Sequence, residues 1–413
     1  MKVLIVNSSD LEGGAARAAH RLYTGLRSSG IDAEMLVLQK KSNDSNIIGP
    51  QGKLSKAFSF LRPSLDKIPL KKYPERTKTP FSPAWVPFSG IAKIINNSDV
   101  DIVHLHWINA GMIRIEEIAK IKKPIVWSLH DMWAFTGGCH YDEECGKYKS
   151  KCGKCPVLNS SIENDLSRKV FLRKKKAYKD LNITLVGLSN WLANCAINSS
   201  LFDRSQVVNI PNPIDTELFK PINKDFSREA LRLPNMKKLV LFGAMNATSD
   251  PRKGFKELTG ALQKAKSDDI ELMILGADKP KDDIKYNFPV HYLGRKYDDL
   301  SLKIIYSAAD VMVLPSIQEN LSNAIMESMS CGTPVTAFDI GGNSDLIDDK
   351  VNGYLAKAYS IKDLSDGILW CLKGEKNSLE LSKQARGKVI SSFEQSIISK
   401  KYVSLYKKIL NLG

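Results

Sequence analysis

Short apolar runs with the length of buried β-strands recur along this chain, and they alternate with segments whose apolar residues have helical spacing. In the first half, the runs that we expect to form strands cover residues 2–8, 32–38, 101–107, 124–130 and 183–189. In the second half, they cover residues 238–244, 270–276, 290–294, 311–316 and 333–338. Regular alternation of strands and helices is typical of doubly wound α/β domains. The pattern therefore predicts a parallel sheet in each half.

The two halves are separated by VVNIPNPIDTELFKP, residues 207–221, in which prolines and asparagines are expected to interrupt regular structure. A chain of 413 residues is too long for one ordinary core, so two domains are expected. The final stretch has helical apolar spacing and a basic face, and it predicts a helix that packs on either domain. The expected boundaries are an N-terminal α/β domain over 1–205, a C-terminal one over 206–390, and the last helix over 391–413.

The composition is that of a globular protein with a strong positive charge. Hydrophobic residues make up 43% of the chain and charged residues 25%, and no apolar run approaches the roughly 18 residues that a membrane span needs. The first residues, MKVLIVNSSD, have the pattern of a strand and not of a secretory signal, which predicts a cytoplasmic location. Of the formal net charge of +15, +12 lies before residue 206.

Two basic segments account for much of this charge. The first, residues 52–78 within an expected insertion near 50–90, mixes Lys and Arg with Phe, Leu and Pro; the second is SRKVFLRKKKAYKD, residues 167–180. Such segments suit a membrane surface, a phosphorylated substrate or a nucleic acid. The second fits a solvated helix face equally well. The aromatic residues of the first favour peripheral contact with an anionic membrane, at the inner face of the cytoplasmic membrane.

Parallel α/β sheets bind ligands at the carboxyl ends of their strands, and unusual residues gather after several of the expected strands. Gly13 and Gly14 follow the first strand and open a helix, where backbone amides can approach an anion. The G-x-G-x-x-G fingerprint is absent, which disfavours a nicotinamide cofactor. His130, followed by Asp131, ends another strand and can donate to a phosphate or a sugar hydroxyl. His106 could line the same site, although a lone His is more often structural.

Arg252 and Lys253 stand just before a helix of the second half, beside a glycine. An Arg can bind two oxygens of a diphosphate and a Lys adds a point charge, so the pair predicts a diphosphate clamp. The alternative is two ordinary surface charges. The position favours the clamp because it corresponds to the glycine loop of the first half.

The stretch SIQENLSNAIMESMSCGTPV, residues 316–335, carries Glu319 and Glu327 at the two ends of a short apolar helix. Eight helical residues bring the second carboxylate to within about 80° of the first around the helix axis. We therefore expect both to contact one elongated ligand, with the backbone of Asn320, Leu321 and Ser322 binding an anion at the helix N-terminus. Carboxylates accept hydrogen bonds from sugar and ribose hydroxyls but repel phosphate.

The residues around these two glutamates resemble the E-x7-E signature of glycosyltransferase family 4, whose members are retaining enzymes with the GT-B fold. DPRKGF, EGGA and NIPNPIDTELFKP resemble the family's cationic loop, glycine loop and interdomain segment, in the family's order. WSLHDMWAFTGGCHY also resembles the subgroup that makes bacterial surface polysaccharides of the colanic acid type. The resemblance implies two Rossmann-like domains that face each other across a cleft.

The resemblance also implies roles for the matching residues. Glu319 would contact the donor sugar, Glu327 would bind the ribose, and Arg252 with Lys253 would neutralise the departing diphosphate. His130 would lie near the donor sugar, and Gly14, next to Gly13, near the phosphates. Asn320 and Ser322 stand where the family often has glycine, and this departure concerns the pocket of the donor sugar.

The implied reaction moves a sugar from a nucleotide-diphosphate sugar of the UDP or GDP type to a glycan or lipid-linked acceptor, with retention of configuration. Catalysis would come from leaving-group stabilisation and positioning, and because loop cations would neutralise the diphosphate we expect no catalytic metal. Two other hypotheses are a nucleotide-sugar epimerase or hydrolase on the same fold, and a zinc-containing nucleic-acid-binding protein. No nucleic-acid reading motif accompanies the basic segments, so we expect no nucleic-acid partner.

Four of the seven cysteines lie within one polar loop, residues 139–155. Four thiolates with a terminal C-x2-C can bind zinc tetrahedrally, and a reducing compartment argues against disulfides. A structural zinc site is the leading hypothesis; free or redox-active thiols and an iron–sulfur cluster are the alternatives. His140 could replace one cysteine. The four expected zinc ligands are Cys139, Cys145, Cys152 and Cys155.

Overall fold

The computed structural model describes residues 1–244, 247–265, 267–280, 286–296 and 298–412. The chain forms two compact units, each built around its own sheet. Unit 1 contains Met1–Pro211 and the C-terminal stretch from Ile398, and unit 2 is Asn212–Ile397. The sequence predicted this boundary at 205/206, and it predicted a final helix that could pack on either domain.

Unit 1 contains a seven-stranded sheet in which every described strand pair is parallel. Val3 and Ile5 face one side of this sheet and Leu4 and Val6 the other, and all four are buried. Burial on both faces is what a parallel sheet covered by helices requires. In spatial order the strands are β3 (Ile47–Ile48), β2 (Asp32–Gln39), β1 (Lys2–Ser9), β4 (Ile102–Leu105), β5 (Ile125–Leu129), β6 (Ile183–Gly187) and β7 (Gln206–Asn209).

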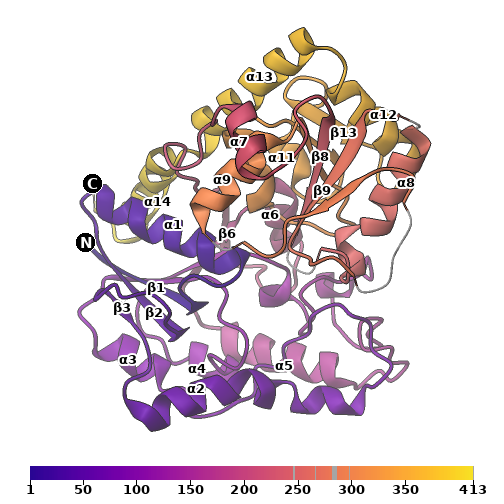
Figure 1. Ribbon diagram of the computed structural model, residues 1–413. Coiled ribbons are helices and arrows are strands. Elements are labelled where there is room, and N and C mark those ends of the chain that lie inside the picture. Colours follow the sequence, from indigo (N-terminus) through magenta and orange to yellow (C-terminus); the bar gives the residue numbers. More distant parts are fainter. Residues whose placement is uncertain (245–246, 266, 281–285, 297, 413) are drawn as a thin grey trace. The chain divides into compact units, whose positions relative to one another are not determined.

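Helices cover the sheet of unit 1 on both faces (Figure 1). One face is covered by α1 (Gly14–Ser28) and α14 (Gln395–Ile409), whose apolar side chains share a core with Val3 and Ile5. The other face is covered by α3 (Ile91–Asn97), α4 (Ile115–Ile118), α5 (Leu166–Tyr178) and α6 (Asn190–Ile197). Helix α2 (Gly52–Asp66) lies in the basic insertion.

Unit 2 repeats the strand order of unit 1 around a six-stranded parallel sheet. With the strands of each sheet numbered in chain order, unit 2 has the order 3-2-1-4-5-6 of a Rossmann fold. Unit 1 has the same order with a seventh strand, β7, added at the edge. The strands are β10 (Val290–Tyr292), β9 (Ile270–Leu275), β8 (Lys238–Gly243), β11 (Val311–Leu314), β12 (Val335–Phe338) and β13 (Gly353–Ala356). The helices are α7 (Lys224–Ala230), α8 (Phe255–Ala265), α9 (Asp299–Ala308), α10 (Asn323–Ser330), α11 (Asn343–Leu346), α12 (Ile361–Cys371) and α13 (Glu375–Phe393).

All ten strands expected from the sequence form, and three further strands join them: β3, β7 and β13. The prediction was wrong about the start of the linker, because Gln206–Asn209 pairs in parallel with β6 as an edge strand. The prolines at 211 and 213 follow this strand, so they end it without preventing it.

Helix α14 is attached to unit 1 by hydrogen bonds deep in the core as well as by apolar packing. The hydroxyl of Tyr406 pairs with Nδ1 of His104 at 2.6 Å, and the hydroxyl of Tyr402 pairs with Oγ of Ser128 at 2.8 Å. Nε2 of His104 and Oγ of Ser128 are themselves 2.8 Å apart. The last helix of the chain therefore completes the polar network behind β4 and β5.

We expect Tyr406→Phe to lower the free energy of unfolding of unit 1 by about 1–3 kcal/mol, because it leaves Nδ1 of the buried His104 without its partner. Urea unfolding followed by tryptophan fluorescence measures this change, since five of the six tryptophans lie in unit 1. Tyr359→Phe, at a half-exposed tyrosine of unit 2, is the matched control. Equal stability of the two variants would show that the Tyr406 hydroxyl contributes nothing.

Candidate active site

Each sheet has one point at which the strand order reverses, between β1 and β4 in unit 1 and between β8 and β11 in unit 2. In open α/β sheets, the crevice outside the carboxyl ends of these two strands binds ligands. The expected site residues follow β1 and β5 in unit 1, and β8 and β11 in unit 2.

In unit 2, the loop after β8 is pressed against the chain that follows β11. Gly254 has φ 73°, and a Cβ atom at this position would lie 1.8 Å from the carbonyl oxygen of Pro315. The amide of Ile317 also donates to the carbonyl of Arg252 at 2.9 Å. Glycine is therefore the residue that allows the two loops to touch. Arg252 and Lys253 belong to a 3-10 turn, Pro251–Lys253, that ends at this glycine.

This contact places Lys253 next to Glu319. Nζ of Lys253 lies 3.3 Å from Oε2 of Glu319, and both side chains are mostly buried. The guanidinium of Arg252 instead bonds Asp250 through two nitrogens, at 2.7 and 3.2 Å. Burial alone would raise the pKa of Asp250, but the hydrogen bonds and charge of Arg252 lower it below its usual value. Each of the two expected clamp cations therefore already has a carboxylate partner.

Two polar side chains beside Glu319 were missed by the sequence interpretation. Oγ of Ser316 and Oε1 of Gln318 are buried and have no hydrogen-bond partner among the described residues. Buried polar atoms normally find partners, so unpaired ones mark a place where a ligand can supply them. Only the fold revealed them, because Ser and Gln carry no distinctive signal in a sequence.

The two glutamates are arranged differently from the helical spacing that was expected. Glu319 lies in the loop before α10, and the helix itself begins at Asn323 after Ser322, whose hydroxyl accepts from the amide of Ile325 at 3.4 Å. The expected angle between the two carboxylates around a common helix axis was therefore wrong, because no continuous helix joins them. Glu327 is buried within α10 and accepts a hydrogen bond of 2.9 Å from the Tyr306 hydroxyl. Asn320, Leu321 and Ser322 form the buried entry to the helix.

In unit 1, the glycine loop after β1 leaves open space at the start of α1. Gly13 has φ 94°, and no atom lies within 4 Å of the position that a Cβ would occupy there. Gly14 is the first residue of α1, a helix of 15 residues. A long helix that begins at an unobstructed glycine suits an anion at its N-terminus. Anion binding by Gly13 and Gly14 stays a prediction.

His130 is half-buried at the end of β5, and it pairs with His106 from the end of β4. Nδ1 of His106 lies 2.9 Å from Nε2 of His130. Burial lowers the pKa of His130 to about 4, and it lowers the pKa of His106 well below its usual value, with a contribution from the neighbouring histidines. Both imidazoles are therefore neutral near pH 7. Nε2 of His106 is buried without a partner among the described residues.

Asp131 organises the loop after β5 and does not face an open site. Its carboxylate accepts from Nδ1 of His140 at 2.6 Å, from Nε1 of Trp107 at 2.9 Å and from the amide of Trp133 at 2.8 Å. Burial alone would raise the pKa of Asp131, but His140 and these donors lower it. Both ring nitrogens of His140 therefore have partners, because its Nε2 pairs with the Ser82 hydroxyl at 2.8 Å.

The cysteine-rich loop brings thiols together without forming a recognisable metal site. Cys139 and Cys155 share a hydrogen bond that raises the pKa of the first well above its usual value and lowers that of the second. Cys152 is buried beside them, and Cys145 is partly exposed. Within the described residues, no group of three or more His, Cys, Asp or Glu side chains is arranged to hold a metal ion. The structural zinc site stays a prediction.

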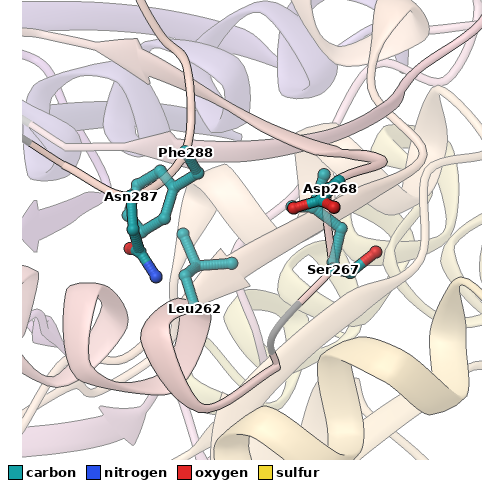
Figure 2. A pocket seen from close by; sticks show the side chains of 6 residues that line it. Leu262, Ser267, Asp268, Asn287 and Phe288 are labelled. Carbon is teal, nitrogen blue, oxygen red and sulfur yellow. The ribbon is translucent and has the colours of Figure 1, made fainter.

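A separate pocket on unit 2 does not belong to this site (Figure 2). Its lining residues lie near the end of α8, around the start of β9 and just before β10. Because these positions precede the strands or begin them, the pocket lies at the edge of the sheet formed by the amino ends of the strands. The site residues of unit 2 follow the carboxyl ends of β8 and β11, at the opposite edge. The lining residues are Leu262, Ser267, Asp268, Ile270, Asn287 and Phe288.

Comparison with known families identifies the class of protein. Residues 12–218 match the family model described as Glycosyltransferase Family 4, and residues 223–388 match the one described as Glycosyl transferases group 1. The chain belongs to glycosyltransferase family 4, and its two Rossmann-like units are those of the GT-B fold. The family and the fold predicted from the motifs are thereby confirmed.

Two curated relatives illustrate the similarity. An N,N'-diacetylbacillosaminyl-diphospho-undecaprenol alpha-1,3-N-acetylgalactosaminyltransferase from Campylobacter jejuni is 28% identical over 205 residues, which are 48% of this chain and 53% of the relative. The putative colanic acid biosynthesis glycosyl transferase WcaC from Escherichia coli is 27% identical over 245 residues, 57% of this chain and 58% of the relative. In both cases the match spans little more than half of the relative's length.

A solved structure shows the same fold over nearly the whole chain. The structure of HepE from Anabaena in complex with UDP-glucose superposes with a TM-score of 0.66 at 16% identity, covering 99% of this chain and 100% of the other. None of the helices in the described part of this chain combines the length and apolar character that a membrane-crossing segment requires.

Three neutral histidines of unit 1 predict that its free energy of unfolding falls at acidic pH. His104, with a pKa lowered by burial to about 3, His106 and His130 all stay neutral when folded, whereas each titrates near pH 6.5 when unfolded. Between pH 6.5 and about 4 the unfolded state binds more protons, so stability falls as the pH falls, by up to about 1.4 kcal/mol per pH unit for each histidine.

Urea unfolding of unit 1 at several pH values between 7 and 4.5 measures this slope. His130→Asn should make the slope shallower, because one of the depressed groups is gone. His291→Asn, in unit 2, is the control and should leave the slope of unit 1 unchanged. Parallel slopes for the wild-type chain and His130→Asn would mean that folding does not lower the pKa of His130.

Proposed function

We propose that this protein transfers a sugar from a nucleotide-diphosphate sugar to a hydroxyl of a glycan or lipid-linked oligosaccharide, with retention at the anomeric carbon. The observation that carries the proposal is the pairing of Lys253 with Glu319 at the point where the strand order of unit 2 reverses. An ion pair at that point combines a cation for a diphosphate with a carboxylate for a sugar. The family and the UDP-glucose complex of HepE support it.

The two cations of the unit 2 site act on the diphosphate in this reaction. Lys253 approaches the diphosphate and neutralises the charge that develops on it as the bond to the sugar breaks. Arg252 adds a second cation, which Asp250 holds in a fixed orientation. The buried backbone of Asn320, Leu321 and Ser322 offers amides at the N-terminus of α10 to the same phosphates. These cations make a catalytic metal unnecessary for leaving-group departure.

The two glutamates act on hydroxyl groups. Glu319 accepts from the donor sugar and, through its contact with Lys253, links the orientation of the sugar to that of the leaving group. Glu327 binds the ribose, with the Tyr306 hydroxyl fixing its carboxylate. Ser316 and Gln318 supply further hydrogen bonds to the donor from their unpaired oxygens. In unit 1, the neutral His130 can donate to a sugar hydroxyl without adding a charge.

The acceptor that we propose is a polysaccharide intermediate linked to a membrane lipid. The Campylobacter relative is described as acting on a diphospho-undecaprenol, and the Escherichia coli relative as acting in colanic acid biosynthesis. The donor would be of the UDP or GDP type. A lipid-linked acceptor requires the enzyme to work at a membrane surface, as the basic N-terminal half also suggests.

We expect Lys253→Ala to lower kcat about 100-fold or more, because it removes the cation that stabilises the leaving diphosphate. The measurement is release of nucleotide diphosphate at saturating donor. Lys256→Ala, which removes an exposed lysine of α8 close by in the sequence, is the control and should keep the wild-type rate. A wild-type rate in Lys253→Ala would remove this lysine from the mechanism.

We expect Glu327→Gln to weaken donor binding about 10-fold, because a charge-assisted hydrogen bond to the ribose is replaced by a neutral one. Thermal shift of the purified chain with UDP, GDP, ADP, TDP and CMP, and with their sugar conjugates, identifies the preferred nucleotide and then compares the variant. Tyr306→Phe tests the second contact of the same carboxylate. Stabilisation by none of these nucleotides would refute the proposed donor site, whereas donor cleavage without any acceptor would favour a hydrolase.

A further inference from the structure

Helix α2 buries polar side chains against the protein and exposes apolar side chains to solvent. The side chains that it buries are Ser59, Arg62 and Asp66. Its apolar residues are exposed instead, with relative accessibilities of 89% for Leu54, 39% for Phe58 and 53% for Leu61. These three residues are spaced at i, i+4 and i+7, so they form one stripe along the helix. This is the reverse of a helix that packs on a core.

The reversed orientation is fixed by specific contacts of the polar face. The Arg62 side chain donates to the carbonyl of Gly111 at 2.6 Å, and to the carbonyls of Pro87 and Val86 at 2.9 and 3.1 Å. Gly111, at φ 70°, lies so close that a Cβ there would be 2.7 Å from the Arg62 carbonyl oxygen. The protein therefore holds this face of α2 firmly and presents the apolar stripe outward.

The exposed apolar surface extends beyond the stripe. Phe60 on the same helix is 77% exposed, and Phe88 is 86% exposed directly after Pro87, whose carbonyl binds Arg62. In Figure 1, α2 runs along the outer edge of unit 1. Single exposed apolar residues are common on protein surfaces, but several apolar residues exposed along one helix mark a binding surface.

The exposed charged side chains of the segment that carries α2 all have the same sign. Between Gly52 and Lys72, the one acidic residue, Asp66, is buried and accepts from the amide of Trp85 at 3.3 Å. Arg62 is buried as well, so the exposed charged side chains of the segment are lysines only. They are Lys53, Lys56, Lys67, Lys71 and Lys72.

We propose that α2 docks unit 1 on an anionic lipid bilayer, with Leu54, Phe58 and Leu61 inserted at the boundary between headgroups and acyl chains. A helix with an apolar face and flanking lysines lies in this interface, and each lysine is attracted to anionic headgroups. A second copy of the chain is a poorer occupant. In a two-fold interface the same patch meets itself, so the lysines would face lysines.

This docking does not depend on the proposed reaction, because membrane binding needs neither donor nor acceptor. It adds to the proposed function the surface that would bring a lipid-linked acceptor and the enzyme together. The two ideas therefore fail separately: a chain that binds nucleotide but not vesicles loses only the docking surface, and a chain that binds vesicles but no nucleotide loses only the donor site.

The test is flotation of the full chain with vesicles of phosphatidylcholine alone, and with vesicles of equal parts phosphatidylcholine and phosphatidylglycerol. We expect binding to the mixed vesicles, weakened by salt because exposed charges are screened. L54S/F58S/L61S should lower this binding about 10-fold or more, because it removes the buried apolar area. K53Q/K56Q should also weaken binding and should reduce its dependence on salt.

The control is I162S/M236S/L379S, which replaces three strongly exposed apolar residues outside α2 and should bind as the wild-type chain does. The thermal shift with nucleotide should be unchanged in L54S/F58S/L61S, which verifies that the variant is folded. Failure of the wild-type chain to bind mixed vesicles, or equal binding by L54S/F58S/L61S, would overturn the proposal. So would a wild-type dimer in sedimentation velocity that becomes a monomer in L54S/F58S/L61S, because a second copy would then cover the stripe.

Discussion

The contact between Gly254 and the carbonyl oxygen of Pro315 is the constraint on which the unit 2 site depends. It joins two loops that follow neighbouring strands, β8 and β11, at the point where the strand order reverses. Any side chain at residue 254 would separate the loops, and Lys253 would lose its position 3.3 Å from Glu319. One backbone contact therefore sets the distance between the cation and the carboxylate, and the buried oxygens of Ser316 and Gln318 lie next to the same contact.

The two units share one topology but differ in the chemistry of their strand ends. Unit 2 places paired charges there: Arg252 with Asp250, and Lys253 with Glu319. Unit 1 places the uncharged imidazoles of His106 and His130 there, and the space above Gly13 is open. The carboxylate of Asp131, which follows His130, is bonded within its own loop. A charged site suits a diphosphate, which must be stabilised as it departs. A neutral polar site suits hydroxyl groups, which need orientation more than charge.

Burial of polar groups also explains how two helices of unit 1 are oriented. His104 of β4 has both ring nitrogens bonded, one to Tyr406 of the last helix and the other to Ser128 of β5. Arg62 of α2 is satisfied by three backbone carbonyls. In both places a buried polar residue fixes the orientation of a helix, because a rotated helix would leave its polar groups without partners. For α2 the consequence is an apolar face directed at solvent.

The sequence by itself determined the ten strands that were expected, the two α/β units and the family, because apolar periodicity and loop motifs depend on residues that are near each other in the chain. It also identified Arg252, Lys253, Glu319 and His130, whose roles remain predictions. Tertiary structure decided what lies far apart in the sequence: the pairing of Lys253 with Glu319, the unpaired oxygens of Ser316 and Gln318, the edge strand β7 and the place of α14 in unit 1. It also decided which face of α2 is buried, because amphipathic spacing shows that two faces exist but not which one the protein covers.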